Sequence, residues 1–161
     1  MTIRYFSLGV FLLAVMAASA IGSSFEAGSW YQEIEKPAWT PPDWLYGPAW
    51  AVIYVLMALA AWRVWIGGRS IRVGAVLWWL LLLGLNAAWS WLMFGLHRPG
   101  WAFLFSLIVL AIAVMCCRAF FLLSRSAGLL LAPYVVWAGF LTALNYSIWT
   151  LNQGGFGQLF G

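Results

Sequence analysis

The sequence predicts an all-α integral membrane protein, built as a bundle of five transmembrane helices. Of its 161 residues, 65% are hydrophobic and only 7% are charged, whereas a soluble domain carries about 25% charged residues. The apolar residues form five long runs, each close to the roughly 20 residues that a helix needs to cross a bilayer. These runs and their connections fill residues 1–161, so we expect a single transmembrane domain.

The first span is predicted over residues 5–21. Arg4 followed by an apolar run that ends in small residues is also typical of a secretory signal peptide. We expect no cleavage, because four further apolar segments follow this run. Ala14, Ala18 and Gly22 recur at every fourth position, a pattern that lets another helix approach closely.

Residues 23–43 form the longest polar stretch between the predicted spans. This stretch contains all the acidic residues of the chain, namely Glu26, Glu33, Glu35 and Asp43. Pro37, Pro41 and Pro42 exclude a long helix here, because proline removes a backbone donor and restricts the residue before it. A connection this long in a compact domain is usually functional, and we expect it to act as a lid over one end of the bundle.

The other four spans are predicted over residues 44–65, 73–94, 101–123 and 128–151. Two glycines at 67 and 68 end the second span, and a tight turn at residues 97–100 follows the third. A short connection at residues 124–127 separates the fourth span from the fifth.

Basic residues predict how the bundle sits in the membrane. Six arginines belong to one side, namely Arg4, Arg63, Arg69, Arg72, Arg118 and Arg125. Only Lys36 and Arg98 belong to the other side. Because cytoplasmic loops carry an excess of Lys and Arg, we expect the amino terminus on the positively charged inner side and residues 23–43 outside. A bacterial membrane is the expected location.

The sequence argues against several kinds of chemistry. No Asp, Glu or Lys lies near the centre of a span, although ion pumps and proton-coupled transporters normally need buried ionisable residues. His97 is the only histidine and Cys116 and Cys117 are adjacent in an apolar run, so we predict neither a metal site nor a disulfide. No acid–base pair or activated nucleophile is evident, and no nucleic-acid partner is expected.

Two amides, Asn86 and Asn145, lie within predicted spans. One interpretation is that they form hydrogen bonds between helices, which stabilise by about 0.6–2 kcal/mol. The other is that one or both face a ligand cavity and orient a bound molecule. The sequence leaves both interpretations open.

Three spans each carry a helical face that combines aromatic residues with a few others. These faces comprise Trp50, Tyr54 and Met57 in the second span, Asn86, Trp89 and Ser90 in the third, and Tyr134, Trp137 and Phe140 in the fifth. On any one helix such a stripe is more often ordinary packing than a binding surface. Three together, beside a Trp- and Pro-rich loop, favour a pocket. Stacked aromatic rings gain about 0.5–1.5 kcal/mol beyond burial, so a flat apolar ligand is expected.

Three segments carry a resemblance to a known family. Residues 30–62 read WYQEIEKPAWTPPDWLYGPAWAVIYVLMALAAW, residues 85–90 read LNAAWS, and residues 132–145 read APYVVWAGFLTALN. These segments resemble the motifs of the translocator protein family, also called the tryptophan-rich sensory protein or peripheral benzodiazepine receptor family. The length, the five spans and the 13 tryptophans agree with it.

The resemblance implies a five-helix fold, often dimeric, whose cavity is closed by the first loop. It implies binding of porphyrins, haem and related tetrapyrroles as ligands, of cholesterol in some members, and of synthetic isoquinoline carboxamides and benzodiazepines. By motif, the lid residues would be Tyr31, Trp39, Pro41 and Pro42, and the pocket residues would be Trp50, Asn86, Trp89, Trp137, Phe140 and Ala143. Tyr54 joins them from the aromatic stripe of the second span.

Two positions depart from the family pattern. Leu82 stands where members often have Gln, one turn before Asn86, which removes one polar contact. Tyr146 is not followed by Lys or Arg, so the weak sterol-recognition pattern is incomplete and strong cholesterol binding is not expected.

The predicted function is a membrane-embedded binding protein for porphyrin- or haem-type tetrapyrroles and related flat apolar molecules, with a regulatory or transport-related role and no required cofactor. One alternative is light-dependent porphyrin breakdown, which would use Trp50 and Trp137. Another is a tetrapyrrole or sterol transporter, and a third is a scaffold whose apparent pocket is only packing. The lipid bilayer is an expected partner, and a homodimer is possible because Gly84 and Ala88 form a small-residue pair.

Overall fold

The computed structural model describes residues 2–25, 28–68 and 72–153. It contains five long helices, which are α1 (Thr2–Ser23), α3 (Asp43–Ile66), α4 (Arg72–Ser90), α5 (Pro99–Leu123) and α6 (Arg125–Gln153). A short helix, α2 (Ser29–Glu33), lies in the first connection, and α4 continues into the π-helical turn η1 (Trp91–Gly95). Five helical segments are long and apolar enough to cross a membrane. The predicted all-α bundle of five spans is confirmed.

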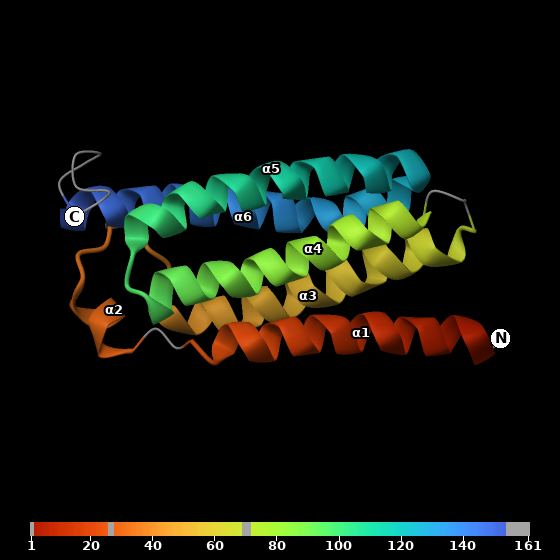
Figure 1. The fold of residues 1–161 in the computed structure, drawn as a ribbon, viewed down its shortest axis with the longest axis horizontal. Helices are drawn as coiled ribbons and strands as arrows, with labels where there is room; N and C mark the ends of the chain where they lie inside the picture. The colour runs from red at the N-terminus through yellow and green to blue at the C-terminus, as the bar shows by residue number, and fades with distance from the viewer. Residues whose placement is uncertain (1, 26–27, 69–71, 154–161) are drawn as a thin grey trace.

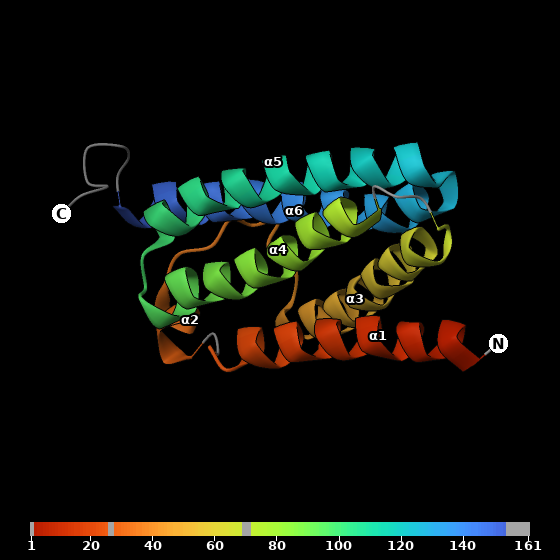
Figure 2. The same cartoon turned by 45° about the vertical axis from the view of Figure 1, so that its right-hand side comes forward.

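The long helices lie side by side (Figure 1). In Figures 1 and 2, α5 and α6 run together along one side of the bundle and α1 along the other, with α3 and α4 between them. Large apolar side chains cover the outside, including Leu122 and Val136, which are 72% and 74% exposed. Such a surface suits lipid rather than water, as expected for a multi-pass membrane protein.

The helix pair α5–α6 is joined by a single residue. Ser124 caps α6, because its hydroxyl accepts from the Ala127 amide and its carbonyl accepts from the Gly128 amide. The helix therefore begins at Arg125, three residues before the predicted span, and Gly128 lies inside it. A Cβ at Gly128 would overlap the Phe121 ring of α5, so glycine permits the close approach of the two helices.

Helix α1 packs its small residues inside the bundle. Ala18 is buried, and a Cβ at Gly22 would lie 3.5 Å from Oγ of Ser90 in α4. The small-residue stripe thus has a role within one chain, and the possible homodimer stays a prediction.

The first connection crosses one end of the bundle. Figure 1 shows α2 and the residues after it at the end where α3 begins and α6 ends, opposite the start of α1. Arg63, Arg72, Arg118 and Arg125 belong to helix ends at the opposite end. The side of the membrane that each end faces, like the lid role of residues 23–43, remains a prediction.

Candidate ligand-binding pocket

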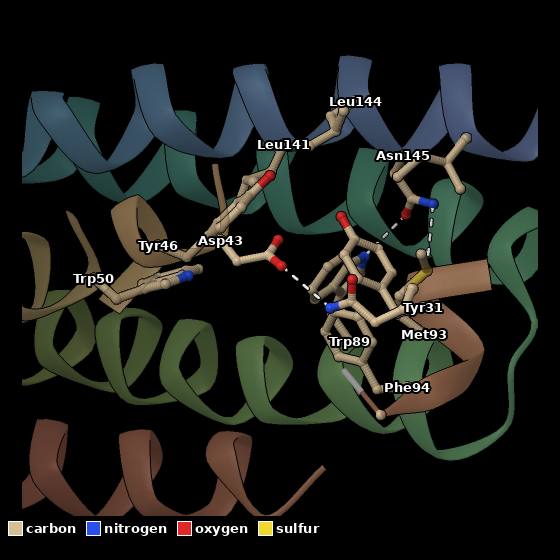
Figure 3. Close-up of a pocket in the computed structure, with 13 residues that line it drawn as sticks. Tyr31, Asp43, Tyr46, Trp50, Trp89, Met93, Phe94, Leu141, Leu144 and Asn145 are labelled. Carbon is tan, nitrogen blue, oxygen red and sulfur yellow. Dashed lines mark hydrogen bonds between the residues drawn. The ribbon is translucent and has the colours of Figure 1, made fainter. Parts of the chain in front are cut away.

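A cavity of about 510 Å³ lies beneath α2, within the 300–1,000 Å³ typical of small-molecule sites. Its walls are Gly28, Tyr31, Gln32, Asp43, Tyr46, Trp50, Trp89, Met93, Phe94, Leu141, Leu144, Asn145 and Ile148. Figure 3 shows these side chains converging from α2, α3, the α4–η1 segment and α6. Most of the lining is aromatic or aliphatic, and the polar groups include the side chains of Gln32 and Asp43 near α2.

Helical spacing places these residues on common faces. In α3, Asp43, Tyr46 and Trp50 follow one another at intervals of three and four residues. Trp89 and Met93 are four apart, and Phe94 joins them because η1 is a π-helical turn, which is wider than an α-helical turn. The local widening therefore directs two successive side chains toward the cavity.

Tyr31 anchors α2 above the cavity. Its side chain is buried, and its ring meets the Phe94 ring edge-on at 5.5 Å. The Lys36 ammonium lies 4.6 Å from the centre of the Tyr31 ring. Burial raises the pKa of Tyr31 above its ordinary value, and the neighbouring Tyr46 and Asp43 raise it further. Tyr31 is therefore a neutral hydroxyl at physiological pH.

The two span amides have different roles. Asn145 Oδ1 accepts from Trp89 Nε1 at 3.2 Å, and Asn145 Nδ2 donates to the Pro99 carbonyl at 3.1 Å and lies 3.7 Å from Met93 Sδ. Asn145 thus joins α6 to α4, η1 and α5, as the interhelical interpretation predicts.

Asn86 is only half satisfied. Its Oδ1 accepts from the Tyr134 hydroxyl at 2.9 Å, but its Nδ2 is buried and has no hydrogen-bond partner in the described part of the chain. Asn86 lines a cavity of about 30 Å³ together with Trp50 and Trp89, which is large enough for one water molecule. It also lines a third cavity of about 330 Å³ between α1, α3 and α4. Its free donor is therefore available to a small polar group.

A chain of aromatic rings runs behind the pocket. Trp50 stacks on Tyr54 with the ring centres 5.1 Å apart and meets Trp137 edge-on at 6.4 Å. Trp137 stacks on Phe140 at 5.4 Å, and Phe140 contacts Trp39 of the first connection at 5.7 Å. Trp137 therefore packs against the cavity-lining Trp50, and Phe140 and Trp39 extend this row of rings to the first connection.

The structure brings most, but not all, of the predicted site residues together. Tyr31, Trp50 and Trp89 line the main cavity, and Asn86 and Tyr54 line adjoining ones. Pro41 and Pro42 precede α3, and Pro42 is its N-terminal flanking residue. Ala143 lies exposed on α6, away from these cavities.

The sequence reasoning did not select several lining residues, above all Gln32, Asp43 and Tyr46. Tyr46 lies one helical turn before Trp50 on the same face, so the aromatic stripe of α3 extends one turn further than predicted. Asp43 lies one turn before Tyr46, so it belongs to the same face of α3. Gln32 carries no such signal, because it meets Asp43, 11 positions further along the chain, only through the path of the first connection.

Five membrane-length helices, with an aromatic cavity at the end of the bundle beneath α2, define a multi-pass integral membrane protein with a pocket for small apolar molecules. The chain belongs to the TspO/MBR family, whose profile matches residues 9–150, and the predicted resemblance is confirmed. It is 42% identical to the tryptophan-rich protein TspO of Archaeoglobus fulgidus, covering 88% of this chain and 94% of that protein.

Similarity extends to proteins of bacteria and mammals. The chain is 34% identical to protein CrtK of Rhodobacter capsulatus, covering 90% of this chain and 92% of that protein. It is 36% identical to the human translocator protein, covering 89% of both chains. Membership of this family supports a general role in binding or transporting small apolar molecules in a membrane.

Proposed function

We propose that the protein binds a tetrapyrrole, such as a porphyrin or haem, or a related flat apolar molecule, in the 510 Å³ cavity, with a regulatory or transport-related role. One observation carries the proposal: Tyr31, Trp50, Trp89 and Phe94 reach a single cavity from four elements. Aromatic rings suit planar conjugated ligands, because offset stacking and edge contacts add to the gain from burial.

Residues 28–42 form the lid of this site in our proposal. Three contacts support it: Trp30 stacks on His97 at 4.5 Å, Gln32 Nε2 donates to Asp43 Oδ2 at 3.2 Å, and the main chain at Glu35 pairs with Asn152. These contacts fix the connection to the turn after η1, to α3 and to α6. All of these residues belong to one chain.

Titration of the purified protein with protoporphyrin tests the proposal, with the Soret band and tryptophan quenching as readouts. We expect saturable binding, and we expect Trp50→Leu to weaken it about five- to fiftyfold through loss of stacking and burial. Trp78→Leu is the matched control, because Trp78 is 42% exposed on α4 and lines none of the three cavities. Non-saturable uptake, or equal effects of both substitutions, would contradict the proposal.

Light-dependent porphyrin breakdown is a second candidate, favoured by one observation. Trp50 lines the cavity and contacts both Tyr54 and Trp137, so an excited porphyrin would lie beside a chain of oxidisable rings. Illumination of the complex tests this candidate. Breakdown is supported if light removes the Soret band and if this loss is abolished by Trp50→Phe and slowed by Trp137→Phe. An unchanged porphyrin spectrum would contradict breakdown and support binding only.

A further inference from the structure

Asp43 is the only charged side chain among the described residues that line the main cavity. Figure 3 shows its carboxylate directed from the start of α3 into the space between Tyr46, Tyr31 and Trp89. Gln32 Nε2 donates to Oδ2 of this carboxylate at 3.2 Å. Gln32 occupies one of the roughly four acceptor positions that a carboxylate offers, so Asp43 can accept further hydrogen bonds from a molecule in the cavity.

No Lys or Arg side chain is among the described residues that line the cavity. The Lys36 ammonium lies over the Tyr31 ring and within 3.4–3.5 Å of the Gln32 and Ile34 carbonyl oxygens, and Lys36 does not line the cavity. Asp43 is the first residue of α3, where the helix dipole supplies roughly half a positive charge. That position alone would explain an acidic residue, but not a carboxylate that lines the cavity and accepts a hydrogen bond from Gln32 of α2.

We infer that Asp43 sets the charge selectivity of the pocket, favouring flat apolar molecules whose polar edge is neutral or donates hydrogen bonds and disfavouring molecules whose edge carries carboxylates. The inference rests on the proposed function and narrows it to a ligand class. Two carboxylates that approach to about 4 Å repel by about 1 kcal/mol even in water, and because Asp43 is exposed, salt screens this repulsion. A tetrapyrrole with esterified or otherwise uncharged side chains therefore matches the polar end of this cavity better than a free dicarboxylic porphyrin.

The test compares protoporphyrin with its dimethyl ester, which keeps the ring and removes both carboxylates. Each compound is titrated against the wild type and Asp43→Asn in nanodiscs of zwitterionic lipid, so that membrane charge does not enrich either compound. Asn retains an oxygen that can accept from Gln32, so the lid contact is kept. The diacid and the ester partition differently into lipid. For each compound we therefore compare its affinity for the wild type with its affinity for the variant, because lipid partition is the same in both titrations.

We expect Asp43→Asn to tighten binding of the diacid about three- to tenfold and to leave the ester within about twofold. The effect on the diacid should grow at about 10 mM salt, where the screening length is roughly 30 Å instead of the 10 Å at 0.1 M. Glu33→Gln is the matched control, since it removes an exposed carboxylate of α2 that does not line the cavity. It should change neither affinity by more than about twofold.

The outcomes separate this inference from the function on which it rests. Saturable binding of the ester, with a diacid affinity that Asp43→Asn does not improve, overturns the charge selectivity and leaves the proposed function intact. Equal tightening by Asp43→Asn and Glu33→Gln also overturns it, because the effect would then come from overall charge. If neither compound binds saturably to the wild type, the proposed function and the inference fall together.

Discussion

The side chain of Asn152 pairs with the main chain of Glu35 in both directions. The Glu35 amide donates to Asn152 Oδ1 and Asn152 Nδ2 donates to the Glu35 carbonyl, each at 2.9 Å. The two residues are 117 positions apart, and Asn152 Nδ2 also donates to the Ile148 carbonyl of its own helix at 2.7 Å. One asparagine in the last turn of α6 thus holds the segment that follows α2 in place.

Asn152→Leu should loosen the first connection without disturbing the bundle. It removes both hydrogen bonds to Glu35, which contribute about 0.5–1.5 kcal/mol each. We expect hydrogen exchange of residues 28–42 to accelerate about fivefold or more and a bound porphyrin to dissociate faster. Leu151→Ala, a change at an exposed neighbour, is the control. Unchanged exchange in Asn152→Leu would show that the other contacts alone hold the connection.

The fold follows from the sequence more directly than the site does. A bilayer requires apolar runs of nearly fixed length, so five runs define five helices. The helix ends are less predictable: residues 124–127 resemble a loop in composition, yet the single capping residue Ser124 suffices to start α6. That cap depends on hydrogen-bond geometry that composition does not reveal.

Site residues were predictable where helical spacing or a family motif selects them, as for Trp50 and Trp89. Helical spacing does not predict Phe94, because it lies five positions after Trp89 and only the π-helical turn brings both side chains to one face. Gln32 meets Asp43 through the path of a loop, which no periodicity describes.

Ala143→Leu should leave porphyrin affinity within about twofold of the wild type. Ala143 is two residues from both Leu141 and Asn145, which line the cavity, and two residues correspond to about 200° around a helix. Its side chain is accordingly exposed on the outside of α6. Titration with protoporphyrin checks this. A large loss of affinity would place Ala143 in the site, as its motif position suggests.

Asn145→Leu should destabilise the bundle by about 1–3 kcal/mol. It leaves the Trp89 indole N–H without its partner, and an unsatisfied buried donor costs about this much. The Pro99 carbonyl also loses Asn145, but as the first residue of α5 it keeps its intrahelical acceptor role. A thermal melt in detergent, followed by tryptophan fluorescence, measures the loss. Asn145→Asp keeps the oxygen that accepts from Trp89 and should lose less than the leucine variant. Equal melting of Asn145→Leu and the wild type would mean that these groups find water.

Tyr134→Phe and Asn86→Leu should have non-additive effects on stability. The Tyr134 hydroxyl donates to Asn86 Oδ1 at 2.9 Å, so either change alone leaves one buried polar group unpaired, whereas the double variant removes both. Residues that share a hydrogen bond couple by about 0.5–3 kcal/mol. A double-mutant cycle on the free energy of unfolding measures the coupling, and a value near zero would show that the bond contributes little.

Gly128→Ala should destabilise the α5–α6 pair by about 1–3 kcal/mol, the usual cost of overpacking a tight contact. A Cβ at this position would overlap the Phe121 ring close to its attachment to the backbone, so a rotation of the ring alone does not relieve the clash. Phe121→Ala should therefore restore stability to the Gly128→Ala variant. Gly139→Ala is the matched control within the same helix, because the nearest atom to its Cβ would be Cδ1 of Leu110 at 4.0 Å. It should be neutral or slightly stabilising, since alanine favours the helix over glycine by about 1 kcal/mol. If both alanine variants melt alike, helix propensity rather than the contact with Phe121 governs this junction.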